Sequence, residues 1–146
     1  MKRLLTMTLA CAMLVVLVFS LASCSAYGKI EKNFTAEGYE VVNTKDEEGN
    51  DALSFIGDFD EDGEVSCTVH ILKKSIGTYA VILEFGANDD AQKKLDEMLT
   101  DADFDNLKDV DDKSKLIREN CVLVPITLNI FNAEATINEM VTLFNK

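Results

Sequence analysis

The first 24 residues constrain this chain more than any other stretch. Lys2 and Arg3 are followed by an apolar run from residue 4 to residue 21 that contains no charged side chain. A short basic segment, an apolar segment and small residues behind it are typical of an export signal. We therefore expect the folded domain to be built from the residues that follow, on the far side of a membrane.

The four residues Leu21-Ala22-Ser23-Cys24 have the order aliphatic, small, small, cysteine. They resemble the lipobox of bacterial prolipoproteins. The resemblance implies that residues 1–23 are removed and that the thiol of Cys24 carries a diacylglyceryl group with fatty chains such as palmitate. It places the mature protein at the cell membrane, facing outward, or at the outer membrane of a cell that has two, because Ser25 rather than an aspartate follows.

Two other interpretations of this stretch remain open. Residues 1–23 can be an ordinary cleaved signal, in which case the protein is secreted and Cys24 is incidental. They can also be an uncleaved anchor, since about 18 apolar residues just cross a hydrocarbon layer of about 30 Å.

Length and charge limit what the mature part can be. Removing residues 1–23 leaves 123 residues, which is the size of one domain, and we expect residues 24–146 to form it. The formal charge of the whole chain is −12, and because the signal holds two basic and no acidic residues, the mature part has −14. This balance excludes nucleic acid as a partner, since its phosphates need Lys and Arg.

Hydrophobic periodicity predicts an α+β fold. Consecutive hairpin strands mixed with helices indicate an antiparallel sheet of about four strands with helices packed on one face. Residues 52–57 have no clear assignment, and residues 101–115 read as acidic and irregular. The expected helices are 26–37, 88–102 (with Asn88 as N-cap) and 133–144, and the expected strands are 39–44, 64–73, 78–85 and 121–131.

Residues 79–99, YAVILEFGANDDAQKKLDEML, combine a strand, an acidic cap and an amphipathic helix. This arrangement looks like the small acidic lipoproteins of unknown function of bacteria that stain Gram-positive. The resemblance implies no functional residues.

Two cysteines remain after Cys11 leaves with the signal and Cys24 takes the lipid. Cys67 alternates with Val69 and Ile71 on the expected inner face of its strand, and Cys121 begins another strand on the opposite parity from Val122. An exported pair can form a disulfide, but these positions favour two free, buried thiols.

The sharpest candidate site is the acidic segment 58–66, DFDEDGEVS. Its first half resembles the calcium loop of EF-hand proteins, D-x-D-x-D-G. Carboxylates at alternate positions of a tight turn can converge on one hard cation. Val69 stands where the loop needs a bidentate Glu, and a strand rather than a helix follows, so a plain acidic turn is the alternative. The ligands would be side-chain oxygens of Asp58, Asp60 and Asp62, the carbonyl of Glu64, and Ser66 directly or through water.

A second acidic stretch repeats the same alternation with Asn106 in place of the glycine. The acids at ligand-like positions in this stretch are Asp101, Asp103, Asp105, Asp109 and Asp112. A solvated acidic loop is the plainer interpretation of this stretch.

Residues suited to catalysis are few. His70 is the only histidine, and it shares a strand face with Ser66 and Thr68 that we expect to point outward. No phosphate loop, nucleophile elbow or dinucleotide fingerprint is present. We therefore expect no enzyme and no cofactor, with calcium as the alternative.

The sequence favours a lipid-anchored, extracytoplasmic binding or adaptor module with an unidentified ligand. Its expected partners are the membrane, through the lipid on Cys24, and a protein of the cell envelope. The alternatives are a calcium-binding lipoprotein that uses the 58–66 loop and an envelope hydrolase.

Overall fold

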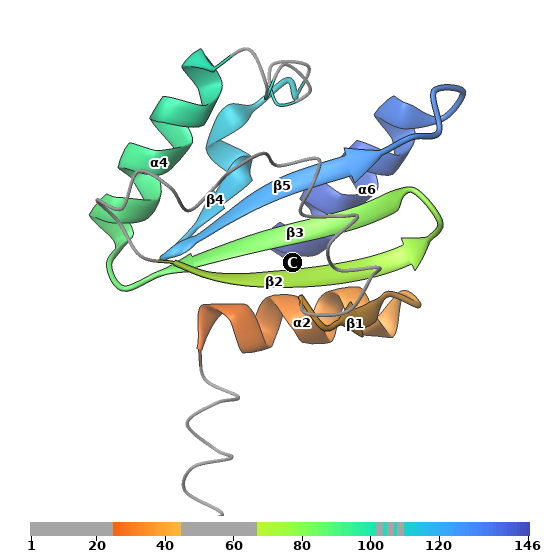
Figure 1. Ribbon diagram of the computed structural model, residues 1–146, viewed down its shortest axis with the longest axis horizontal. Coiled ribbons are helices and arrows are strands. Elements are labelled where there is room, and N and C mark those ends of the chain that lie inside the picture. The colour runs from red at the N-terminus through yellow and green to blue at the C-terminus, as the bar shows by residue number, and fades with distance from the viewer. Residues whose placement is uncertain (1–24, 45–66, 102–103, 105–106, 108–109) are drawn as a thin grey trace, which may run out of the picture.

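The computed structural model describes residues 25–44, 67–101, 104, 107 and 110–146. These residues form three α-helices, a 3-10 helix and five strands (Figure 1). Among them, no helix has the length and apolar character needed to cross a membrane. The elements in chain order are α2 (Ala26–Ala36), β1 (Glu40–Val42), β2 (Cys67–Ser75), β3 (Thr78–Phe85), α4 (Asn88–Thr100), η2 (Lys113–Leu116), β4 (Ile117–Arg118), β5 (Cys121–Thr127) and α6 (Ala133–Asn145).

The strands form one antiparallel sheet in the order β1-β2-β3-β5-β4. The α+β class and the antiparallel sheet are therefore confirmed, with five strands instead of about four. The extra strand, β4, is only two residues long and pairs with the first two residues of β5. Its shortness explains why alternation in the sequence did not reveal it.

Strand β3 lies at the centre of the sheet, and seven of its eight residues are buried. Its apolar character on both parities predicts cover on both faces, and the structure confirms this. Helices α2 and α6 pack against each other, and α6 also packs on β5. The expectation of helices on one face holds for these two, whereas α4 lies on the opposite face, against β3, β5 and β4 (Figure 1).

Helix α2 begins immediately after Ser25, whose hydroxyl accepts a hydrogen bond of 3.0 Å from the backbone N–H of Gly28. This is a side-chain N-cap. Tyr27, in the first turn, stacks on His70 of β2. Tyr39, which follows the helix, lies under the ammonium group of Lys74. Helix α2 therefore runs along β2 toward the β2–β3 turn.

Several boundaries differ from the sequence-based expectation. Strand β5 ends at Thr127 instead of Phe131, and the residues beyond it form a loop. The N-cap of α4 is Ala87, which makes no side-chain cap bond, and Asn88 is the first helical residue. Pro125 lies in the part of β5 beyond the two residues that β4 covers. There its missing N–H removes no bond to β4.

The segment between α4 and β4 is more than a solvated acidic loop. Phe104, Leu107 and Val110 are buried and belong to the hydrophobic core, and Leu116 of η2 joins them. Their spacing of three is one turn of helix, and the many acids between them hid this periodicity in the sequence.

Candidate binding surface

The calcium ligands predicted in the first acidic segment, Asp58, Asp60, Asp62, Glu64 and Ser66, lie outside the described residues. The calcium interpretation of this segment stays a prediction. Within the described parts of the chain, no three His, Cys, Asp or Glu side chains gather closely enough to hold a metal ion.

Of the second acidic stretch, the structure describes Asp101 and Asp112. Asp112 is the N-cap of η2, and its carboxylate accepts bonds from the backbone N–H of Ser114 at 3.2 Å and from its hydroxyl at 2.5 Å. The Ser114 hydroxyl bond is the main reason that the pKa of Asp112 is lowered. Lys115 lies 3.7 Å from the same carboxylate. Asp112 therefore acts as a helix cap here.

His70 does not lie on an open strand face, contrary to the expectation for it. Its ring stacks on Tyr27 with 3.5 Å between centroids and 11° between planes. Its Nε2 lies 2.9 Å from Oε2 of Glu84, on the neighbouring strand. Both faces of the sheet are covered by helices, so the alternation of β2 does not separate an inner from an outer set. The imidazole joins α2 to the sheet.

Cys67 and Cys121 form no disulfide with each other, and Cys121 is buried as expected, whereas Cys67 is only half-buried. Cys67 pairs with Phe85 and Cys121 pairs with Glu84 in the strand register. Because Glu84 and Phe85 are consecutive in β3, the two thiols point to opposite faces of the sheet. Burial, helped by the nearby Glu84 charge, raises the pKa of the Cys121 thiol to about 12. A thiol with such a pKa is protonated at neutral pH and is a poor nucleophile.

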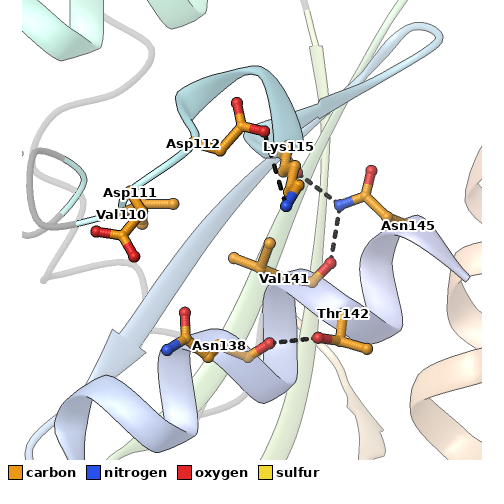
Figure 2. Close-up of a pocket in the computed structure, with 8 residues that line it drawn as sticks. All are labelled: Val110, Asp111, Asp112, Lys115, Asn138, Val141, Thr142 and Asn145. Carbon is orange, nitrogen blue, oxygen red and sulfur yellow. Dashed lines mark hydrogen bonds and ion pairs between the residues drawn. The ribbon is translucent and has the colours of Figure 1, made fainter.

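A shallow pocket of about 400 Å³ lies between η2 and α6, and Figure 2 shows the residues that line it. Asn145 Nδ2 donates to the carbonyl oxygens of Lys115 and Val141, at 2.8 Å each. The hydroxyl of Thr142 donates to the carbonyl of Asn138. These groups bond to one another instead of converging on a ligand, and neither His70 nor a cysteine lines the pocket. The pocket gives the hydrolase alternative no support.

The most unusual surface lies at the end of the sheet that carries the β2–β3 turn. Four large apolar side chains are exposed there, with exposed fractions of 94% for Ile76, 58% for Leu128, 81% for Ile130 and 90% for Phe131. We call these four residues the apolar tip. Ile76 lies in the turn, and the other three lie in the connection from β5 to α6.

A backbone contact joins the two loops of the apolar tip. The N–H of Leu128 donates to the carbonyl of Gly77 at 2.8 Å. Gly77 has φ of +77°, and a Cβ there would lie 3.0 Å from the Cβ of Leu128. Only glycine meets both demands, because a side chain is strained at this φ and would crowd Leu128.

The connection from β5 to α6 is held by its own polar groups. The side-chain oxygen of Asn129 accepts from the N–H of Phe131 at 3.2 Å, and the hydroxyl of Thr127 accepts from the N–H of Asn129 at 3.2 Å. The N–H of Asn132 donates to the carbonyl of Asn129 at 3.3 Å. These local turns fix the backbone that presents Ile130 and Phe131 to solvent.

The apolar tip and the start of α2 lie at opposite ends of the sheet. Lys29 of α2 lies 4.0 Å from Glu119 in the β4–β5 turn at one end, whereas the tip follows Ser75 and Thr127 at the other (Figure 1). The eight residues of β3 span about 26 Å, at about 3.3 Å per residue.

The sequence did not reveal this surface, because residues 128–131 were expected to form the end of the last strand. Asn129 could have revealed it, since an asparagine inside an apolar run is a turn residue. The chain matches no protein-family model, no curated protein and no solved structure. Its function has to be inferred from its own residues.

Proposed function

We propose that this protein is a lipid-anchored, extracytoplasmic binding module of the cell envelope, without a catalytic role. The observation that carries the binding role is the apolar tip. Soluble proteins seldom expose contiguous apolar patches, and the patches that they do expose are often functional. Here four large apolar side chains are exposed on two loops that a backbone hydrogen bond joins.

The anchor is supported by how Cys24 and α2 meet. The lipobox-like cysteine stands one residue before Ser25, and Ser25 is the N-cap of α2. A lipid on Cys24 would thus join the folded domain with almost no stalk, and it would hold the end of the sheet opposite the β2–β3 turn at the membrane surface.

The non-catalytic role is supported by how the reactive side chains are used. His70 is engaged by the Tyr27 ring and the Glu84 carboxylate, and Cys121 is a buried thiol with a raised pKa. Both side chains contribute to the packing of the sheet.

The anchor is tested by metabolic labelling with a fatty-acid analogue. We expect the wild-type protein to take up label and to fractionate with membranes, and we expect Cys24→Ser to take up none, because only the thiol accepts the lipid. Cys121→Ser is the matched control and should label like the wild type. Label that persists in Cys24→Ser would contradict the proposed anchor.

A further inference from the structure

The residues around the apolar tip carry no charge. Residues 75–78 and 127–133 include no Asp, Glu, Lys or Arg, although 27% of the chain is charged. Lys74, near the end of β2, is paired with Glu139 of α6. This end of the sheet can therefore enter an apolar medium without desolvating an ion within its loops.

Several backbone N–H groups of the tip are already hydrogen-bonded within the protein. The N–H groups of Leu128, Asn129, Phe131 and Asn132 all donate within the protein. A lipid environment offers no hydrogen-bond partners, so backbone groups that enter it must be satisfied internally. These bonds meet the requirement for four N–H groups of the loop that carries Ile130 and Phe131.

The size of the tip favours lipid over a protein partner. A stable protein interface buries about 800 Å² and uses about 20–30 residues on each partner. The tip offers only four large apolar side chains, and one of them, Phe131, is aromatic. Insertion of loop tips into lipid needs neither a larger area nor a matching groove, because the lipid adapts to the side chains.

The proposed anchor brings the tip within reach of the same membrane. The domain begins directly behind Cys24, and the sheet is about 26 Å long. A domain that lies with its strands along the membrane touches it at both ends. The second contact is then intramolecular and forms at a high effective concentration, so that even a weak insertion is effective.

We infer that the apolar tip inserts into the lipid surface that holds the anchor, as a second contact that lays the domain along the membrane. This inference rests on the proposed lipid anchor. The lipid keeps the protein at the membrane, and Ile76, Leu128, Ile130 and Phe131 set its orientation there.

The absence of tryptophan from the chain allows a direct test. Phe131→Trp places a single indole at the tip, and Gln92→Trp places one on an exposed position of α4 as the matched control. Each lipidated variant is reconstituted in phosphatidylcholine–phosphatidylglycerol vesicles, with and without brominated acyl chains. We expect Phe131→Trp fluorescence to shift to shorter wavelength and to lose most of its intensity with brominated lipid, whereas Gln92→Trp stays unchanged.

Four results would overturn the inference. Emission from Phe131→Trp that stays at the solvent-exposed wavelength and is not quenched shows that the tip stays in water. A shift without lipid quenching that grows with protein density places a second copy there. A shift that occurs only in native membranes places another envelope protein there. Equal quenching of both variants shows contact that is not specific to the tip.

Failure of the anchor is recognised separately. The mass of each purified protein shows whether Cys24 carries lipid before the vesicles are added. If it does not, the proposed anchor is wrong. Flotation of the unlipidated Phe131→Trp protein with the same vesicles, compared with Ile130→Asn in the same background, then tests the tip alone. Equal flotation of the two proteins would contradict a role of the tip in lipid contact.

Discussion

Gly77 shows how one residue fixes the arrangement of two loops. Its φ of +77° allows the tight turn after β2, and its lack of a side chain lets Leu128 approach. The carbonyl of Gly77 then accepts the bond that joins the turn to the β5–α6 connection. The arrangement of the apolar tip thus depends on Gly77, a residue without a side chain.

We expect Gly77→Ala to lower the free energy of unfolding by about 1–2 kcal/mol, the cost of a left-handed conformation for a residue with a side chain. The new methyl group would also crowd the Cβ of Leu128 at 3.0 Å. Gly86→Ala is the matched control, because Gly86 has no positive φ and open space around it. Urea unfolding measures both variants, and equal stability of the two would contradict the role assigned to Gly77.

The buried thiol of Cys121 makes the folded state less stable at alkaline pH. Burial raises its pKa from 9.0 to about 12, so between these values the unfolded chain loses the thiol proton and the folded protein keeps it. The unfolded state then binds fewer protons, and stability falls as pH rises. We expect the urea midpoint to fall between pH 9 and 12, and to fall less in Cys121→Ala. A Cys121→Ala variant with an unchanged pH profile would contradict this cause.

At the scale of elements, α2 connects the proposed anchor to the sheet. Ile30 and Phe34 bury one side of the helix, and Asn33 donates from its side chain to the carbonyl of Leu143 in α6. Tyr27 adds the stack on His70. The helix therefore cannot move away from the sheet without breaking contacts with both β2 and α6.

The stability of α2 depends in part on its N-cap, Ser25. We expect Ser25→Ala to lower the free energy of unfolding by about 1 kcal/mol, because the N–H of Gly28 loses its acceptor. Ser25→Thr, which keeps a hydroxyl, should recover most of the loss. Urea unfolding of the unlipidated chain from residue 25 measures the three proteins. No difference between Ser25→Ala and wild type would mean that the cap adds nothing to the stability of the fold.

At the scale of the whole molecule, charge and apolar surface are separated along the chain. Residues 45–66 hold nine acidic residues and one lysine, whereas the loops of the apolar tip hold no charge. The acids keep the protein soluble, and the tip offers the surface on which a partner or a lipid layer can act. The proposed anchor and the tip lie at the two ends of the sheet.

The calcium alternative is tested by the thermal stability of the whole domain. The sequence predicts that Asp58, Asp60, Asp62, Glu64 and Ser66 bind one ion. A ligand at about 100 times its dissociation constant stabilises the fold by about 2.7 kcal/mol, which raises the melting midpoint by several degrees. We expect such a shift with calcium, and little with magnesium, if the site exists. No shift beyond that of ionic strength, or the same shift in Asp60→Asn, would make the segment an acidic turn.

The sequence by itself determined the class of the fold. Period-two and helical patterns predicted β3, α2, α4 and α6 nearly to their ends, because these elements bury long regular stripes. It also favoured separate thiols for Cys67 and Cys121 over a disulfide, and the strand register places the two on opposite faces of the sheet. Whether Cys24 is lipidated, or segment 58–66 binds calcium, stays a prediction from the sequence.

Only the tertiary structure decided where His70 lies and which surface is apolar. Parity assigned His70 to an outer face, but α2 covers that face, and a helix from another part of the chain leaves no trace in the local pattern. Ile130 and Phe131 looked like the end of a buried strand. Their exposure follows from the bond between Leu128 and Gly77, residues about 50 positions apart, together with the Asn129 turn that follows. Such non-local contacts are what a single sequence does not show.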